Sequence, residues 1–132
     1  MDIVSDVKTW ITTDLPDLYA TMKIDSWGDD MEALQIRGDP SSAVVTEFID
    51  GSMTGQQQVT FYARSAYPAT ALDALQSIYD ELNQPEITLT DVLVMRVSPV
   101  SIPAFVSKET TGESIYSFTV NIDFDNNTEI GV

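Results

Sequence analysis

The segment Ser114–Asn127, SIYSFTVNIDFDNN, decides the fold class of this chain. Apolar and polar residues alternate along it with a period of two, which predicts a strand with one buried and one solvated face. The residues expected on the buried face are Tyr116, Phe118, Val120, Ile122 and Phe124, and those expected on the solvated face are Ser117, Thr119, Asn121, Asp123 and Asp125. Such a strand belongs to a sheet that other elements cover on one side only.

Two helices are predicted to cover that side. Apolar residues at steps of three and four predict an amphipathic helix over about Asp2–Thr13, which ends shortly before Pro16. The run PATALDALQSIYDELN begins at Pro68, a residue favoured in the first turn of a helix. The apolar stripe of this second helix consists of Ala71, Leu72, Leu75, Ile78, Tyr79 and Leu82.

Further strands are predicted on both sides of the second helix. AVVTEFID and QQQVTFYAR flank GSMTG, a pattern that indicates a hairpin with a loop of several residues. Short strands are expected at about Ala20–Ile24 and Glu32–Arg37. After the second helix, DVLVMRVSPVSIPAFVS is strand-like, but Pro99 and Pro103 interrupt it, which suits an edge strand or a bend. KETTGES supplies the loop before the closing strand.

These elements predict an α+β fold, a mainly antiparallel sheet with two helices packed on one face. We expect one domain over residues 1–132, because neither a repeat nor a linker divides the chain. With 132 residues, of which 43% are hydrophobic, the chain is large enough to bury a core.

The charge balance excludes several partners. Six Lys and Arg stand against 21 Asp and Glu, a formal net charge of -15, so we expect no basic patch and no tight nucleic-acid binding. The N-terminal residues lack the pattern of a signal peptide. No apolar run approaches the ~20 residues of a membrane span, so we expect a soluble protein made in a cytoplasm.

Ordinary catalytic chemistry is also disfavoured. The chain has no Cys and no His, which removes thiolate zinc sites, cysteine nucleophiles and the Ser-His-Asp triad. Asp80 and Glu81 lie beside an apolar stripe and are expected to form the polar face of a helix. IDGSMTG lacks the glycine spacing of a phosphate-binding loop. We therefore expect no catalytic residue and no cofactor. The alternative is an enzyme that uses carboxylates alone, such as a glycosidase-like pair.

Asp123 and Asp125 share the solvated face of the closing strand and could in principle hold a cation. A calcium loop starting at Asp123 would need Gly where Thr128 stands and a Glu at its twelfth position, beyond Val132, the tenth. An extended strand also separates the two side chains by roughly 6 to 7 Å. A solvated strand face is therefore the favoured interpretation, with a metal site as the alternative.

Interaction residues are predicted at two further places. Asp50, Ser52, Met53 and Thr54 lie at or beside the expected hairpin tip, where an apolar Met could anchor a partner. Arg64 and Arg96 are expected to pair with carboxylates of the same or a neighbouring subunit. Together with Asp123 and Asp125, which would then be surface residues, these tip residues and Arg64 form the predicted interaction set.

The order of elements resembles that of the tail-terminator, or tail-completion, proteins of long-tailed bacteriophages, often called minor capsid or minor tail proteins. The segments that carry the resemblance are VKTWI, EFIDGSMTGQQQVTFYARS, ALDALQSIYDELN, VMRVSPVSIPAFV, ETTGES and IYSFTVNIDFD, which together cover nearly the whole chain. No invariant catalytic motif defines this family.

The resemblance implies a structural virion protein, made in the bacterial host and located at the head-proximal end of the tail. Such a subunit forms a ring, usually hexameric, that caps the tail tube, stops its polymerisation and provides the surface for joining the head. Its partners would be further copies of itself, the tail-tube protein and a head-completion protein. Another neck or tail component, such as a stopper, a head-tail joining protein or a tail-tube subunit, is the alternative. An acidic lining would let DNA pass such a ring without sticking.

Overall fold

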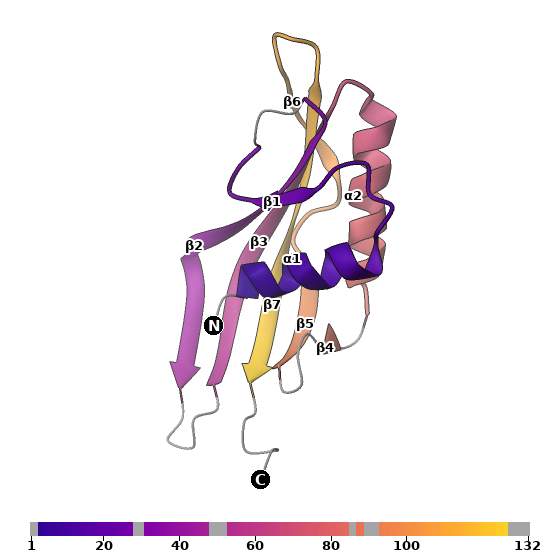
Figure 1. Ribbon diagram of the computed structural model, residues 1–132. Coiled ribbons are helices and arrows are strands. Elements are labelled where there is room, and N and C mark those ends of the chain that lie inside the picture. The colour runs from indigo at the N-terminus through magenta and orange to yellow at the C-terminus, as the bar shows by residue number, and fades with distance from the viewer. Residues whose placement is uncertain (1–2, 28–30, 48–52, 85–86, 89–92, 127–132) are drawn as a thin grey trace.

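A computed structural model describes residues 3–27, 31–47, 53–84, 87–88 and 93–126, and these form a sheet with two helices (Figure 1). The helices are α1 (Ile3–Asp14) and α2 (Pro68–Leu82). The strands are β1 (Met22–Ile24), β2 (Ala33–Glu47), β3 (Met53–Ser65), β4 (Ile87–Thr88), β5 (Leu93–Pro99), β6 (Ala104–Lys108) and β7 (Ser114–Asn126). The predicted α+β class is confirmed.

The seven strands form one sheet in the order β1-β2-β3-β7-β5-β4, and β6 also pairs with β7. Every pairing is antiparallel except that of β1 with β2, which is parallel. The predicted closing strand, β7, lies at the centre of the sheet. Its residues from Val120 onward pair with β5, and those before Phe118 pair with β6.

The proline-interrupted segment is a single edge with a bend in it, as the sequence predicts. Pro99 ends β5 and Pro103 directly precedes β6. Between them, the backbone N–H groups of Val100 and Ser101 both donate to the carbonyl oxygen of Thr119, at 2.9 and 3.1 Å. The bend therefore stays attached to β7 although neither proline can donate a ladder hydrogen bond.

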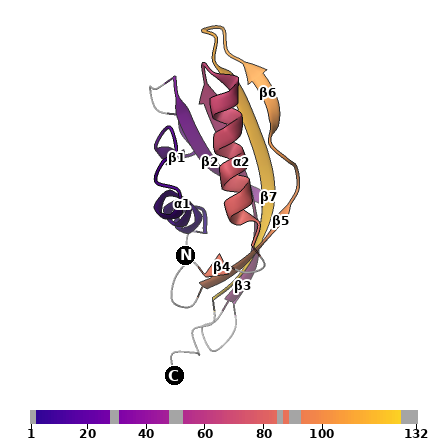
Figure 2. The ribbon, with the colours of Figure 1, turned by 90° about the vertical axis from the view of Figure 1, so that its right-hand side faces the viewer.

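Both helices pack on the same face of the sheet (Figure 2). In Figure 1, α1 crosses the strands and α2 runs along them. The alternation predicted for β7 holds from Phe118 onward, since Phe118, Val120, Ile122 and Phe124 are buried in the core between sheet and helices. Before Phe118 it does not hold, because Tyr116 is only half-buried and Ile115 is buried instead. Phe118 stacks on Phe61 of β3 with ring centroids 5.0 Å apart, which joins the two central strands.

Three details differ from the sequence-based expectations. The segments predicted as two strands, Glu32–Arg37 and 43–50, belong to the single strand β2, up to Glu47. The register of β2 against β3 shifts between Asp39 and Val44, and Pro40 lies within this irregularity without a partner residue in β3. Because Pro40 has no partner there, its missing N–H breaks no ladder hydrogen bond. Leu72 was expected in the buried stripe of α2 but is exposed, and Ala74 is buried instead, because the stripe is centred on Leu75 and Ile78.

The third difference concerns the hairpin tip. Met53, Thr54 and Gly55 were expected in the loop, but they belong to β3 and pair with β2 on one side and β7 on the other. Thr54, for example, pairs with Thr46 of β2 and with Asp125 of β7. Asp50 and Ser52 lie outside the described residues. No helix in the described ranges is long and apolar enough to cross a membrane.

Candidate functional site

The face of the sheet opposite the helices is the first candidate surface. Alternation places Thr54, Gln56, Gln58, Thr60, Tyr62 and Arg64 of β3 and Ser117, Thr119, Asn121, Asp123 and Asp125 of β7 on it. The hydroxyl groups of Thr60 and Thr119 lie 3.0 Å apart across the two strands. We call this the open face. It is polar throughout these strands and no helix covers it (Figure 2).

The structure brings three of the predicted interaction residues together at one end of the open face. Thr54 is directly opposite Asp125 in the β3–β7 ladder, and Asp123 lies two residues away on the same face. Arg96 of β5 is opposite Asp123 and forms an ion pair with Asp125, with Nη1 3.2 Å from Oδ2. The pairing predicted for Arg96 is therefore observed within one chain.

This arrangement gives Asp125 a cationic partner from its own chain. The two side chains of the pair are 53% and 40% exposed, so it contributes no more than about 1 kcal/mol to stability. Within the described ranges, no three acidic side chains gather in a way that could hold a metal ion. Asn127 and Glu129, which continue the oxygen-rich spacing, lie outside those ranges.

Arg64 lies at the other end of β3 and belongs to a cluster that the sequence did not predict. Its Cζ atom is 4.7 Å from the ring centroid of Trp27, and Arg37 Cζ is 5.7 Å from that of Tyr62. The two rings meet edge to face with centroids 6.2 Å apart. We call Trp27, Arg37, Tyr62 and Arg64 the arginine–aromatic cluster. The guanidinium groups and the aromatic rings attract each other through cation–π contacts.

A backbone turn brings Trp27 to the cluster. Asp25, directly after β1, has φ +54°, a left-handed conformation that Asp tolerates better than most residues. Its N–H donates to the carbonyl of Ile36 at 3.0 Å, which fixes the turn to β2. Ala33 and Gln35 alternate with the core residues of β2 and yet are buried, so this end of the open face is covered.

A hollow lies beside the cluster. It has a volume of about 370 Å³ and is lined by Tyr19, Ala20, Thr21, Lys23, Trp27, Glu32 and Ala33. The Glu32 carboxylate accepts hydrogen bonds from Ser65 Oγ at 2.9 Å and from the Ala66 N–H at 3.0 Å. Glu32 therefore fixes the end of β3 where α2 begins.

Tyr19 has a comparable structural role. Its hydroxyl lies between two carbonyl oxygens, that of Arg64 at 2.8 Å and that of Ala33 at 2.9 Å, and it is within donating distance of both. Burial, and then the nearby Glu32 carboxylate, raise the pKa of the phenol above its ordinary value. A phenol in this state holds its proton at any physiological pH, so it is suited to bridging β2 and β3 rather than to proton transfer.

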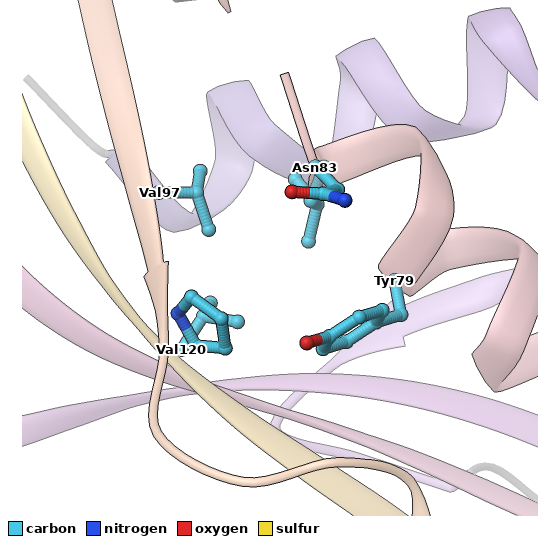
Figure 3. A pocket seen from close by; sticks show the side chains of 6 residues that line it. Tyr79, Asn83, Val97 and Val120 are labelled. Carbon is cyan, nitrogen blue, oxygen red and sulfur yellow. The ribbon is translucent and has the colours of Figure 1, made fainter. Parts of the chain in front are cut away.

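A second, smaller crevice separates α2 from β5. It is lined by Tyr79, Leu82, Asn83, Val97, Pro99 and Val120, and Figure 3 shows Tyr79 facing Val97 and Val120 across it. Its volume is about 10 Å³, which is room for at most about one water molecule. This crevice is a gap in packing and cannot hold a substrate.

The outer edge of the sheet at β5 and β6 is the last candidate surface. All five residues of β6 are exposed. Four large apolar side chains are exposed there, Val100, Ile102, Phe105 and Val106, which we call the apolar edge. The prolines predicted an edge strand at this place. The sequence could not show that its apolar side chains remain uncovered.

No protein-family model matches the sequence, and no curated protein matches it either.

Proposed function

We propose that this chain is a structural subunit of a phage virion, a tail terminator whose ring caps the tail tube and stops its polymerisation. The apolar edge is the observation that supports this proposal most directly. A lone soluble protein seldom leaves a strand edge both unpaired and lined with large apolar side chains, because such an edge associates with other chains. A subunit that assembles buries it.

The chemistry of the polar groups supports a structural role as well. Tyr19 and Glu32 hold β2, β3 and the start of α2 together, and Asp125 is paired with Arg96. The crevice at Tyr79 is too small for a substrate, and the polar groups of Tyr19 and Glu32 beside the larger hollow form hydrogen bonds within the chain. An assembly protein requires a stable scaffold and contact surfaces, and these residues serve that purpose.

The partners proposed for this ring are the tail-tube protein on one side and a head-completion protein on the other, at the head-proximal end of the tail. The net charge of -15 suits a ring through which DNA passes, since carboxylates repel phosphates. In this proposal the acidic residues Asp123 and Asp125 contribute to the lining.

A tail-tube subunit, a stopper or a head-tail joining protein is the second candidate. The open strand edges are the observation that favours it, because head-to-tail contacts that do not close generate continuous filaments instead of rings. A tube subunit polymerises alone, whereas a terminator does not.

The experiment is to add the purified chain to polymerising tail-tube protein of the same phage and to follow tube length by electron microscopy. A terminator shortens the tubes as its molar ratio rises, and on its own it forms no tubes. Tubes that grow to the same length at every ratio would contradict the proposal. Long tubes formed by this chain alone would favour the tube-subunit alternative.

A further inference from the structure

The hollow beside Trp27 has the size of a binding site. Its volume of about 370 Å³ lies within the usual range of ligand pockets, roughly 300 to 1,000 Å³. A second hollow, of about 290 Å³, shares the lining residues Tyr19, Ala20 and Thr21 with it and is also lined by Thr12, in the last turn of α1. We call the two adjoining hollows the β1 groove, because Thr21 directly precedes β1.

Lys23 gives this groove a cation without a partner. Met22 is buried in the core, so the alternation along β1 turns Lys23 to the opposite face of the sheet, where it is half-buried and lines the larger hollow. Within the described part of the chain, neither a hydrogen bond nor an ion pair engages its ammonium group, although the chain contains 21 acidic residues. A carboxylate that docks here would form a charge-assisted hydrogen bond with Lys23.

The acids near Lys23 do not neutralise it. Glu32 lines the same hollow, but one of its carboxylate oxygens accepts from Ser65 Oγ and the other from the Ala66 N–H, which directs the group toward the start of α2. Asp25, in the turn after β1, lines neither hollow. The side of the groove at Lys23 is therefore complementary to an anion, and complementarity of this kind selects the partner.

Arg37 adds a second positive charge on the same face. Its neighbour Ile36 is buried in the core, so Arg37 points to the open face, where it is exposed. It follows by two residues Gln35, which is opposite Lys23 in the β1–β2 pairing. The contact that the structure shows for its guanidinium group is the Tyr62 ring, with Cζ 5.7 Å from the centroid, and this contact leaves the charge in place.

The backbone beside the groove is open as well. In the strand order β1 is the terminal strand, and among the described strands it pairs with β2 alone. The other edge of β1 can therefore accept a further strand. Peptides that bind in this way gain affinity from main-chain hydrogen bonds and specificity from the pockets that receive their side chains.

We propose that the β1 groove binds an acidic segment of a partner protein, which lies extended along β1 and places a carboxylate against Lys23. A small free anion would satisfy Lys23 but not the backbone groups of β1, whereas a peptide can satisfy both. The inference goes beyond the proposed ring. Its test needs no tail tubes, so a negative result would leave the terminator proposal standing.

The first test is an NMR titration of the isotope-labelled full chain with the capped peptide Thr-Val-Glu-Val-Thr. We expect shifts concentrated at Thr21, Lys23 and the Trp27 indole N–H. The peptide Thr-Val-Gln-Val-Thr should bind about tenfold more weakly, because it brings no charge to Lys23. Sodium propionate supplies the carboxylate without a peptide backbone and should cause no comparable shifts. An absence of shifts with the Glu peptide, equal affinity for the two peptides, or propionate binding as tightly as the Glu peptide would overturn the inference.

The second test changes Lys23 itself. Lys23→Glu should bind the Glu peptide about tenfold more weakly and should now prefer Thr-Val-Lys-Val-Thr, an exchange that a merely structural role of Lys23 would not produce. Lys108→Glu is the matched control, since it makes the same change of charge on the exposed strand β6, and it should bind as the wild type does. Circular dichroism confirms that each variant is folded.

Two outcomes of this second test would contradict the proposal. One is a folded Lys23→Glu that shows no exchange of preference, or a loss just as large in Lys108→Glu. The other is a change in the sedimentation of the protein alone on Lys23→Glu, because the occupant of the groove would then be a second copy of this chain.

Discussion

Arg64 lies over the ring of Trp27, with its Cζ atom 4.7 Å from the ring centroid. The contact joins the segment after β1 to the far end of β3 across the open face. It therefore fixes the N-terminal part of the chain to the centre of the sheet, where α2 begins. Cation–π contacts of this kind contribute about 0.5 to 2 kcal/mol, depending on how far water is excluded.

Replacing Trp27 should loosen this attachment. Trp27→Ala removes both the stack on Arg64 and the edge contact with Tyr62, and we expect a loss of about 1 to 3 kcal/mol in the free energy of unfolding. Urea denaturation measures the loss. Trp27→Phe keeps a ring and should recover about half of it. Equal stability of Trp27→Ala and wild type would show that the cluster does not hold this segment.

The Tyr19 hydroxyl should contribute a measurable share of stability. Tyr19→Phe removes the donor that lies between the carbonyl oxygens of Arg64 and Ala33 without emptying the site. We expect a loss of about 1 kcal/mol in the free energy of unfolding, the usual contribution of a hydrogen bond. Tyr67→Phe is the control, because Tyr67 is 68% exposed and the loss of its hydroxyl should leave the free energy of unfolding unchanged. A loss as large in the control would refute the assignment.

Stability should depend on pH through Glu81. Desolvation, and then the neighbouring Asp14 carboxyl with which it shares a hydrogen bond, raise the pKa of Glu81 above its ordinary value. The folded state then binds the proton more tightly than the unfolded state does, so this group favours folding more as pH falls through the raised pKa. At neutral pH the two carboxylates repel.

Glu81→Gln should therefore stabilise the protein at pH 7, by no more than about 0.5 kcal/mol because the site is close to solvent, and have little effect near pH 4. Thermal unfolding at the two pH values measures the difference. Asp80→Asn is the matched control, since Asp80 accepts from Gln76 Nε2 at 3.0 Å and should show no such gain at pH 7. A gain of the same size at both pH values would argue against a repulsive pair.

The open face gives a prediction about DNA. If Asp123 and Asp125 line the ring, Asp123→Lys/Asp125→Lys should make particles retain DNA during ejection at low salt and release it at high salt, as phosphate contacts with lysine do. Asp73→Lys/Asp80→Lys, on the exposed surface of α2, makes the same change in charge away from the open face. Ejection that is unchanged in the first variant, or equally slowed in both, would exclude a lumen lined by β7.

The strand β7 could be predicted from the sequence because one of its faces meets the core and the other meets water. The alternation of apolar and polar residues with a period of two follows from this difference between the two faces. The stripe of α2 likewise predicted a helix, although Leu72 shows that apolar character alone does not establish burial. The boundary of a stripe depends on where the sheet ends beneath the helix, which a single sequence does not contain.

The arginine–aromatic cluster could not be predicted, because Trp27 reaches Arg64 only through the parallel pairing of β1 with β2 and the turn at Asp25. Neither is marked by a local pattern. The apolar edge was hidden for a related reason. Val100, Ile102 and Phe105 look like core residues in the sequence, and only the topology shows that no further strand or helix covers them.

The most direct test of the proposed role is cryo-electron microscopy of tail tubes incubated with this protein. We expect a ring of subunits seated at one end of each tube, with the opposite end bare. Tubes with bare ends at saturating protein, or protein bound along the whole length of the tube, would contradict a terminator.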